Sequence, residues 1–150
     1  AVQNLQGIET LASRRDRVYD NALVISYVLE NHAKVAGGNA AGLPEYRDHA
    51  MAQKYMGGKA EGIISFGVKS EADAMAAGGR FQDALQLFTR LVNIGDAKSL
   101  ACHPASTTHR QLNPAELAKA GVSVDMVRLS VGIEHIDDLL ADLEQALAAV

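Results

Sequence analysis

An arginine in a short strand-like segment is the residue best suited to chemistry in this sequence. In residues 126–131, apolar side chains occupy every second position, which places them on one face of a strand. Arg128 and Ser130 share the other face. A planar guanidinium held on a rigid strand is suited to bidentate binding of a substrate carboxylate. A solvent-facing arginine or a structural ion pair would give the same pattern, so alternation alone leaves these interpretations open.

Two loops carry polar groups that suit a supporting role. The segment Asn93-Ile-Gly-Asp-Ala-Lys-Ser-Leu100 predicts a turn leading into a short helical element, whose backbone amides and small polar side chains would reach a carboxylate. The alternative is a plain connecting loop. The segment His103-Pro-Ala-Ser-Thr-Thr-His109 is dense in hydrogen-bond donors and acceptors. It suits either an active-site loop or a turn satisfied by its own hydroxyls.

Cys102, His103 and His109 invite two other interpretations. Their spacing is not that of a zinc finger and no fourth ligand is evident, so no metal is predicted. A nucleophilic Cys102 would need an orienting base, which the sequence does not show.

These residues need a framework of strands and helices to position them. Apolar residues recur at three-and-four spacing from about residue 4 to residue 32, which predicts one long helix of about 40 Å. Such a helix either bridges two domains or lies across its own. Further helices are predicted at 46–55, 72–85 and 136–149, and strands at 62–68, 87–92 and 126–131.

A helix start is also predicted at Asn113-Pro-Ala-Glu116. Asn113 would cap the helix, proline suits its first position, and Glu116 would complete a capping box. Strands that alternate with helices indicate an α/β fold with the helices on one face of the sheet.

The bulk composition excludes several classes of function. The net charge is −4, and basic residues cluster only near Arg14, Arg15 and Arg17, so no nucleic-acid partner is predicted. No apolar run reaches membrane-spanning length, so no membrane partner is predicted either. The single cysteine favours a reducing compartment, and we expect the protein to be cytoplasmic.

Five segments spread over almost the whole chain form a further pattern. They are Leu5-Gln-Gly-Ile-Glu-Thr-Leu11, Gly62-Ile-Ile-Ser-Phe-Gly-Val68, Val92-Asn-Ile-Gly-Asp-Ala-Lys-Ser-Leu100, His103-Pro-Ala-Ser-Thr-Thr-His109 and Val127-Arg-Leu-Ser-Val-Gly-Ile-Glu-His-Ile-Asp-Asp-Leu139. In this order they resemble the Cys/Met-metabolism family of pyridoxal-phosphate enzymes, and the last three together are highly specific.

The resemblance implies a fold and a domain organisation. The chain would be the C-terminal small domain of an aspartate-aminotransferase-like enzyme of fold type I, with a long connecting helix at about 1–32 and an α/β domain at about 33–150. One departure is the strand expected within 35–44, which has few branched or aromatic residues. None of the six lysines lies in the family's Ser-x-x-Lys context. The cofactor-binding domain is therefore expected to be absent, and this chain is expected to bind no pyridoxal phosphate by itself.

The resemblance also implies roles for four residues. Arg128 matches the arginine that binds the substrate α-carboxylate, and Asn93 falls where family members contact that carboxylate beside it. Thr108 matches a hydroxyl that helps to hold this arrangement. Ser99 lies in the same motif as Asn93, with a weaker case for direct contact. No catalytic residue and no cofactor-binding or metal-binding residue is predicted within the chain.

The implied whole enzyme uses pyridoxal phosphate and an amino-acid substrate. Its partners would be the remaining N-terminal part of the protein and further copies of itself, a tetramer by resemblance. Within the family the resemblance favours replacement of the acetate of O-acetylhomoserine by sulfide, which gives homocysteine. Synthesis or cleavage of cystathionine and cleavage of methionine are the alternatives within the family. A non-catalytic α/β binding or assembly domain is the alternative from another class.

Overall fold

A five-stranded mixed sheet with helices against one face forms the framework of the protein. The structure is a computed structural model that describes residues 2–60 and 62–150. The helices are α1 (Val2–Glu9), α2 (Leu11–Glu30), α3 (His49–Met56), α4 (Ala74–Ala84), α5 (Pro114–Lys119) and α6 (Ile136–Ala148), with a 3₁₀ turn at Pro104–Ser106. The strands are β1 (Val35–Asn39), β2 (Ile63–Val68), β3 (Thr89–Arg90), β4 (Leu100–Cys102) and β5 (Met126–Ser130).

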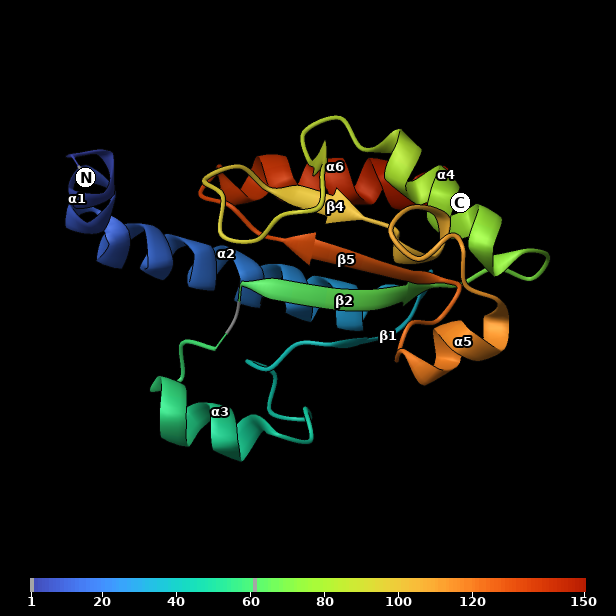
Figure 1. Ribbon diagram of the computed structural model, residues 1–150, viewed down its shortest axis with the longest axis horizontal. Helices are drawn as coiled ribbons and strands as arrows, with labels where there is room; N and C mark the ends of the chain where they lie inside the picture. The colour runs from blue at the N-terminus through green and yellow to red at the C-terminus, as the bar shows by residue number, and fades with distance from the viewer. Residues whose placement is uncertain (1, 61) are drawn as a thin grey trace.

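The strands run in the spatial order β1-β2-β5-β4-β3. The pairs β1/β2, β2/β5 and β5/β4 are antiparallel, and only the short β3 pairs with β4 in parallel. Figure 1 shows α2 and α6 behind the sheet and β2, β5 and β4 toward the viewer. The α/β prediction with helices on one face is therefore confirmed.

The core lies between the sheet and the helices α2, α4 and α6. Alternate residues of β2 and β5 point into it, which buries Phe66 and Val127 completely or almost so. The Phe66 and Phe81 rings meet edge to face with centroids 5.6 Å apart, which joins β2 to α4. The other face of the sheet is left without a helical layer over β5, and α5 packs in a separate small cluster at its end.

The predicted helix at 4–32 is wrong as a single element. The chain forms α1 and α2 with a break at Thr10, whose backbone (φ −103°, ψ 7°) leaves the helical range. The apolar stripe is buried only in α2, at Ala22, Ile25 and Leu29, whereas α1 buries no residue. The hydrogen bond from Arg14 Nη2 to the Gly7 oxygen at 2.9 Å joins the two helices, but no buried residue of α1 anchors the first turns in the core. No helix among the described residues has the length and apolar character needed to cross a bilayer.

The segment 85–102 also differs from the prediction. The strand expected at 87–92 shrinks to Thr89–Arg90, because the buried Asp142 carboxylate accepts the backbone N–H groups of residues 86–88 at 2.8–2.9 Å. These amides are thereby withdrawn from strand pairing. The helical element expected before Leu100 does not form, and the unpredicted strand Leu100–Cys102 follows instead. Three fully buried residues are too few to show alternation.

Several local predictions are confirmed. Asn113 accepts the N–H groups of Ala115 and Glu116, while the Glu116 carboxylate accepts the N–H of Asn113, so the capping box is present. The helices α4 and α6 form within a few residues of their predicted bounds, and α3 begins later than predicted, at His49. The strand β1 forms despite its few branched residues, with an irregular register between Val35 and Gly38.

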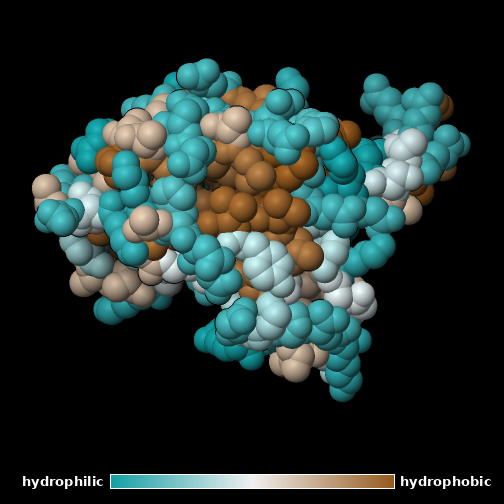
Figure 2. Space-filling model, turned by 180° about the vertical axis from the view of Figure 1, so that it is seen from behind, coloured by the Kyte–Doolittle hydropathy of each residue, from teal (hydrophilic) through white to brown (hydrophobic). Residues whose placement is uncertain are grey.

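Seen from behind, the helical side carries an apolar patch at its centre (Figure 2). Val24 and Val28 on α2 contribute to the exposed apolar surface of the chain, at 42% and 39% exposure. The sheet core therefore does not use all of the apolar surface that α2 offers.

Candidate functional site

Arg128 lies at the middle of the sheet on its open face. It is the Cα partner of Ser65 on β2 and of Cys102 on β4. Val127 and Leu129, its neighbours along β5, are completely buried in the core on the opposite face. The strand therefore anchors the arginine from behind and turns its side chain toward the face that no helix covers.

The guanidinium of Arg128 has few protein partners. Its Nη2 donates to the backbone oxygen of Asn93 at 3.4 Å, which is long for a hydrogen bond. Its Nε is buried and has no hydrogen-bond partner. No acidic side chain forms an ion pair with it in the described parts of the chain. A fixed cation with an unsatisfied donor is an arrangement suited to an anionic ligand.

The turn at residues 93–98 lies beside this arginine. The N–H of Gly95 donates to the hydroxyl of Ser130 at 3.3 Å, so the turn crosses the same face of β5. Gly95 has φ +79°, a backbone conformation that favours glycine. Asn93 meets Arg128 through its carbonyl oxygen, while its side-chain oxygen accepts the N–H of Ile94 at 2.9 Å. The structure thus brings the two predicted residues together, with the amide of Asn93 already bonded within the turn.

Ser99 is completely buried at the end of the turn. Its hydroxyl donates to Glu134 at 2.8 Å and accepts the N–H of Gly132 at 2.8 Å. Its backbone N–H donates to the second Glu134 oxygen at 2.6 Å. These bonds occupy Ser99 within the protein, which favours a supporting role over contact with a ligand.

Thr108 lies apart from the arginine in this structure. It is exposed, and its hydroxyl is 2.8 Å from Nδ1 of His109. No hydrogen bond joins Thr108 to Arg128 among the described residues. The preceding Thr107 is closer to the site, because its hydroxyl lies 3.4 Å from Sγ of Cys102, the strand partner of Arg128.

The imidazole and thiol groups of this region have structural partners. His103 is buried, with Nδ1 2.8 Å from the Ser106 hydroxyl and Nε2 2.9 Å from the Val124 oxygen. No cluster of metal-ligating side chains occurs in residues 2–60 and 62–150.

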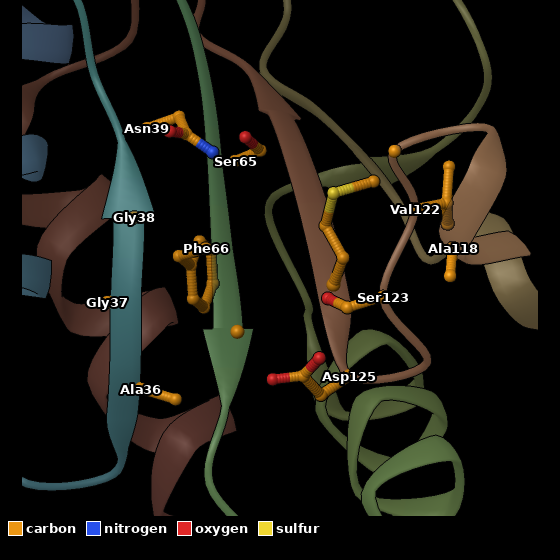
Figure 3. Close-up of a pocket in the computed structure, with 13 residues that line it drawn as sticks. Ala36, Gly37, Gly38, Asn39, Ser65, Phe66, Ala118, Val122, Ser123 and Asp125 are labelled. Carbon is orange, nitrogen blue, oxygen red and sulfur yellow. The ribbon is translucent and has the colours of Figure 1, made fainter. Parts of the chain in front are cut away.

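A cavity of about 420 Å³ lies between β1, β2 and the segment that leads into β5 (Figure 3). Ser65, the strand partner of Arg128, lines it, but Arg128 itself does not. Asn39, Ser123 and Asp125 add polar groups from β1 and from the loop before β5. A Cβ at residue 67 would come within 2.2 Å of Oδ2 of Asp125, so a larger residue there would require the carboxylate to move.

Two residues of this site carry no role in the sequence prediction. Ser65 could have been found by extending the alternation argument to β2, where residues 63, 65 and 67 occupy the face opposite the core. Glu134 gives no such signal, because its partner Ser99 lies 35 positions away in the sequence.

A hydrogen bond to Asp16 raises the pKa of Lys59, with the charge of Asp16 as the second cause. The pair ties the segment before β2 to α2.

The fold and this face define an α/β domain with an arginine on the open face of its sheet. Comparison with known proteins identifies the family of this domain. The profile of the Cys/Met metabolism PLP-dependent enzymes matches residues 1–148. The chain belongs to this family of pyridoxal-phosphate-dependent enzymes.

Curated relatives and a solved structure agree with this assignment. O-acetyl-L-homoserine sulfhydrylase 1 of Thermus thermophilus is 48% identical over 144 residues, which are 96% of this chain and 34% of that protein. L-methionine gamma-lyase of Pseudomonas deceptionensis is 47% identical over 146 residues, which are 97% of this chain and 36% of that protein. The chain thus spans about a third of the length of these relatives.

One structural neighbour is a Campylobacter jejuni protein assigned as an O-acetylhomoserine (thiol)-lyase. Its crystal structure contains N'-pyridoxyl-lysine-5'-monophosphate. The two chains superpose with a TM-score of 0.87 and are 42% identical, and the match covers 96% of this chain and 34% of the neighbour.

The residues described here do not fit the cofactor itself. None of the six lysines is buried, and several ammonium groups are bonded at the surface: Lys34 to the carbonyl oxygens of Leu147 and Val150, and Lys69 to that of Ala33. None of them lines the cavity that Ser65 borders. A lysine that binds an aldehyde cofactor needs a free amine in a protected site, so no step of the reaction is assigned to a lysine of this chain.

Proposed function

We propose that Arg128 binds the α-carboxylate of an amino-acid substrate. The observation that supports this most strongly is the buried Nε without a partner on a guanidinium without an ion pair. A buried hydrogen-bond donor without a partner is costly, whereas a bidentate carboxylate would satisfy two donors at once. The long contact to Asn93 leaves Nη2 able to shift toward such a ligand.

The whole protein, in this proposal, is an O-acetylhomoserine sulfhydrylase, and residues 1–150 are its C-terminal domain. The relatives of that name at 48% identity support this reaction. Pyridoxal phosphate, when bound by the rest of the enzyme, supplies the electron sink for the chemistry. Arg128 contributes orientation: a carboxylate anchored on the sheet fixes which bond of the amino acid faces the cofactor.

The supporting roles are proposed from the same geometry. Asn93 would contribute its carbonyl to the placement of the guanidinium, and Ser99 would hold the turn that carries Asn93. Thr108 is proposed to contact Arg128 and the substrate carboxylate only after the 107–109 loop changes conformation, since its hydroxyl is 2.8 Å from Nδ1 of His109.

Methionine cleavage is the second candidate within the family. The methionine gamma-lyase of Pseudomonas deceptionensis is almost as similar as the sulfhydrylases, at 47% identity. Cystathionine synthesis and cleavage are less favoured, because the first relatives are sulfhydrylases, lyases of methionine and a homocysteine synthase. A non-catalytic assembly domain is less favoured. If no ligand bound at Arg128, its buried Nε would stay without a hydrogen-bond partner.

Assembly with further copies and with the remaining part of the enzyme is proposed from the exposed apolar surface. Val2, Leu5 and Ile8 of α1 are all more than half exposed, and the helical side carries the patch seen in Figure 2. Surfaces of this kind are typical of protein interfaces. A tetramer in the cytoplasm is the state that we propose.

The test is substitution of Arg128 in the whole, cofactor-loaded enzyme. Arg128→Ala is expected to raise KM for O-acetylhomoserine by about 100-fold, which corresponds to about 3 kcal/mol for a lost charge-assisted pair. Arg128→Lys should recover part of the affinity, because it keeps the charge but not the planar fork. Arg47→Ala, at an exposed arginine bonded to Asp48, is the matched control.

Two outcomes would contradict the proposal. An unchanged KM in Arg128→Ala would remove the carboxylate role. Release of a thiol from methionine, without formation of homocysteine from O-acetylhomoserine and sulfide, would replace the sulfhydrylase by the lyase.

A further inference from the structure

We propose that Glu134 is a positioning residue for the carboxylate site. It would act without touching the substrate, by holding the turn at residues 93–98 against Arg128. The inference rests on the function proposed above and adds to it a residue on the loop between β5 and α6.

The carboxylate of Glu134 holds one end of the turn with both of its oxygens. One oxygen accepts the backbone N–H of Ser99 at 2.6 Å and the other accepts the Ser99 hydroxyl at 2.8 Å. The same hydroxyl accepts the N–H of Gly132 at 2.8 Å. Ser99 is completely buried and Glu134 is half-buried, so water competes less for these bonds than for fully exposed ones.

The loop that carries Glu134 is itself fixed from behind by α2. The buried Asn21 donates its side-chain N–H groups to the backbone oxygens of Gly132 at 3.1 Å and Glu134 at 2.9 Å. The Glu134 carboxylate is therefore attached to a rigid support, which a positioning residue requires.

The space between the loop and the turn is filled closely. A Cβ at Gly132 would overlap the backbone oxygen of Ala97 and come within 2.6 Å of the carbonyl carbon of Lys98. The N–H of Ile133 donates to the oxygen of Ala97 at 3.0 Å. The turn thus lies directly on the loop, and a small displacement of one moves the other.

The turn has little else to hold it. Residues 93–98 are all exposed, and none belongs to a helix or strand. Between Ser99 and Arg128, the fixed points are the bond from Ile133 to Ala97, the bond from Gly95 to Ser130 and the contact of Asn93 with Arg128. A change at Glu134 is therefore transmitted to the guanidinium along a short, continuous set of contacts.

A neutral side chain cannot replace this carboxylate fully. Glutamine has one acceptor oxygen where Ser99 presents two donors, so Glu134→Gln leaves one of them unmatched. Ser99 then loses one of its two bonds to the side chain of residue 134. The turn is held less firmly, and the carbonyl of Asn93 is released from its place beside Arg128.

The experiment measures kinetics of the whole enzyme with Glu134→Gln and with Ser99→Ala, a smaller change at the same contact. Both variants are expected to raise KM for O-acetylhomoserine by about tenfold, while kcat at saturating substrate stays within about twofold. The matched control is Asp142→Asn. Asp142 is also a buried carboxylate that accepts backbone N–H groups, but on the loop at 86–88. It should lower the unfolding midpoint and leave KM unchanged.

A second readout separates positioning from loss of stability. In the Arg128→Ala background, Glu134→Gln should raise KM no further, because the residue through which it acts is gone. An equal rise in both backgrounds would overturn the inference, and so would a lower unfolding midpoint with unchanged KM in both variants. If Arg128→Ala itself leaves KM unchanged, the proposed function fails; if only the Glu134 and Ser99 variants do so, the positioning role fails alone.

Discussion

The hydroxyl of Ser130 accepts the backbone N–H of Gly95 at 3.3 Å, two residues along β5 from Arg128 and on the same face of the strand. Ser130 is buried although it faces the open side of the sheet, because the 93–98 turn covers it. One strand thus provides both the cation and the anchor for the loop beside it. The hydrogen bond between Gly95 and Ser130 thus fixes an exposed turn to a rigid strand.

Ser130→Ala should loosen this turn. The variant loses one hydrogen bond, worth about 1 kcal/mol, and KM for the amino-acid substrate should rise by about fivefold in the whole enzyme. Steady-state kinetics check this result. Ser13→Ala, at an exposed position of α2, should leave KM unchanged. An equal KM in the two variants would show that the bond does not position the site.

Two adjacent glycines of α4 should respond to alanine in opposite ways. A Cβ at Gly78 would come within 2.6 Å of the His103 ring, whereas a Cβ at Gly79 meets nothing within 4 Å. Gly78→Ala should therefore destabilise the protein by about 1–3 kcal/mol through overpacking. Gly79→Ala should stabilise it by up to about 1 kcal/mol, because alanine is the better helix former. Urea unfolding midpoints check both values, and equal shifts would contradict the packing of His103 on α4.

Removal of the helix cap at Asn113 should cost about 1 kcal/mol of stability. The side chain accepts two backbone N–H groups at the start of α5, and Asn113→Ala leaves both without it. The control is Gln111→Ala, at an exposed residue outside the helix. Chemical denaturation that gives the same midpoint for both variants would show that the cap contributes nothing measurable.

The 150-residue chain should not bind pyridoxal phosphate covalently at a defined lysine. None of its lysines is buried or lines the cavity that Ser65 borders. Absorbance spectra and mass spectrometry after borohydride reduction check this, with the whole enzyme as the positive control. Stoichiometric labelling of one lysine in the short chain would contradict the expectation.

Local chemistry in the sequence was enough to predict much of the framework. The capping box at Asn113 depends on residues three positions apart, and the burial of Leu139 and Leu143 in α6 follows from helical spacing. The placement of Arg128 on a strand opposite Val127 and Leu129 likewise needs only alternation. Each of these features is determined within a few residues, so each can be read before the chain is folded.

The remaining features were decided by contacts between distant segments. Asp142 accepts the amides of residues 86–88 and so withdraws them from strand pairing. It lies more than fifty positions away in the sequence, so no local pattern predicts this contact. The long predicted helix is divided at Thr10, since only the residues of α2 find a core to bury against. The arginine was visible in the sequence, but the turn from Asn93 and the support of Glu134 reach it only in the folded chain. Polar groups form hydrogen bonds with, and apolar groups pack against, the groups that lie near them in space. The sequence alone does not show which distant residues become those neighbours.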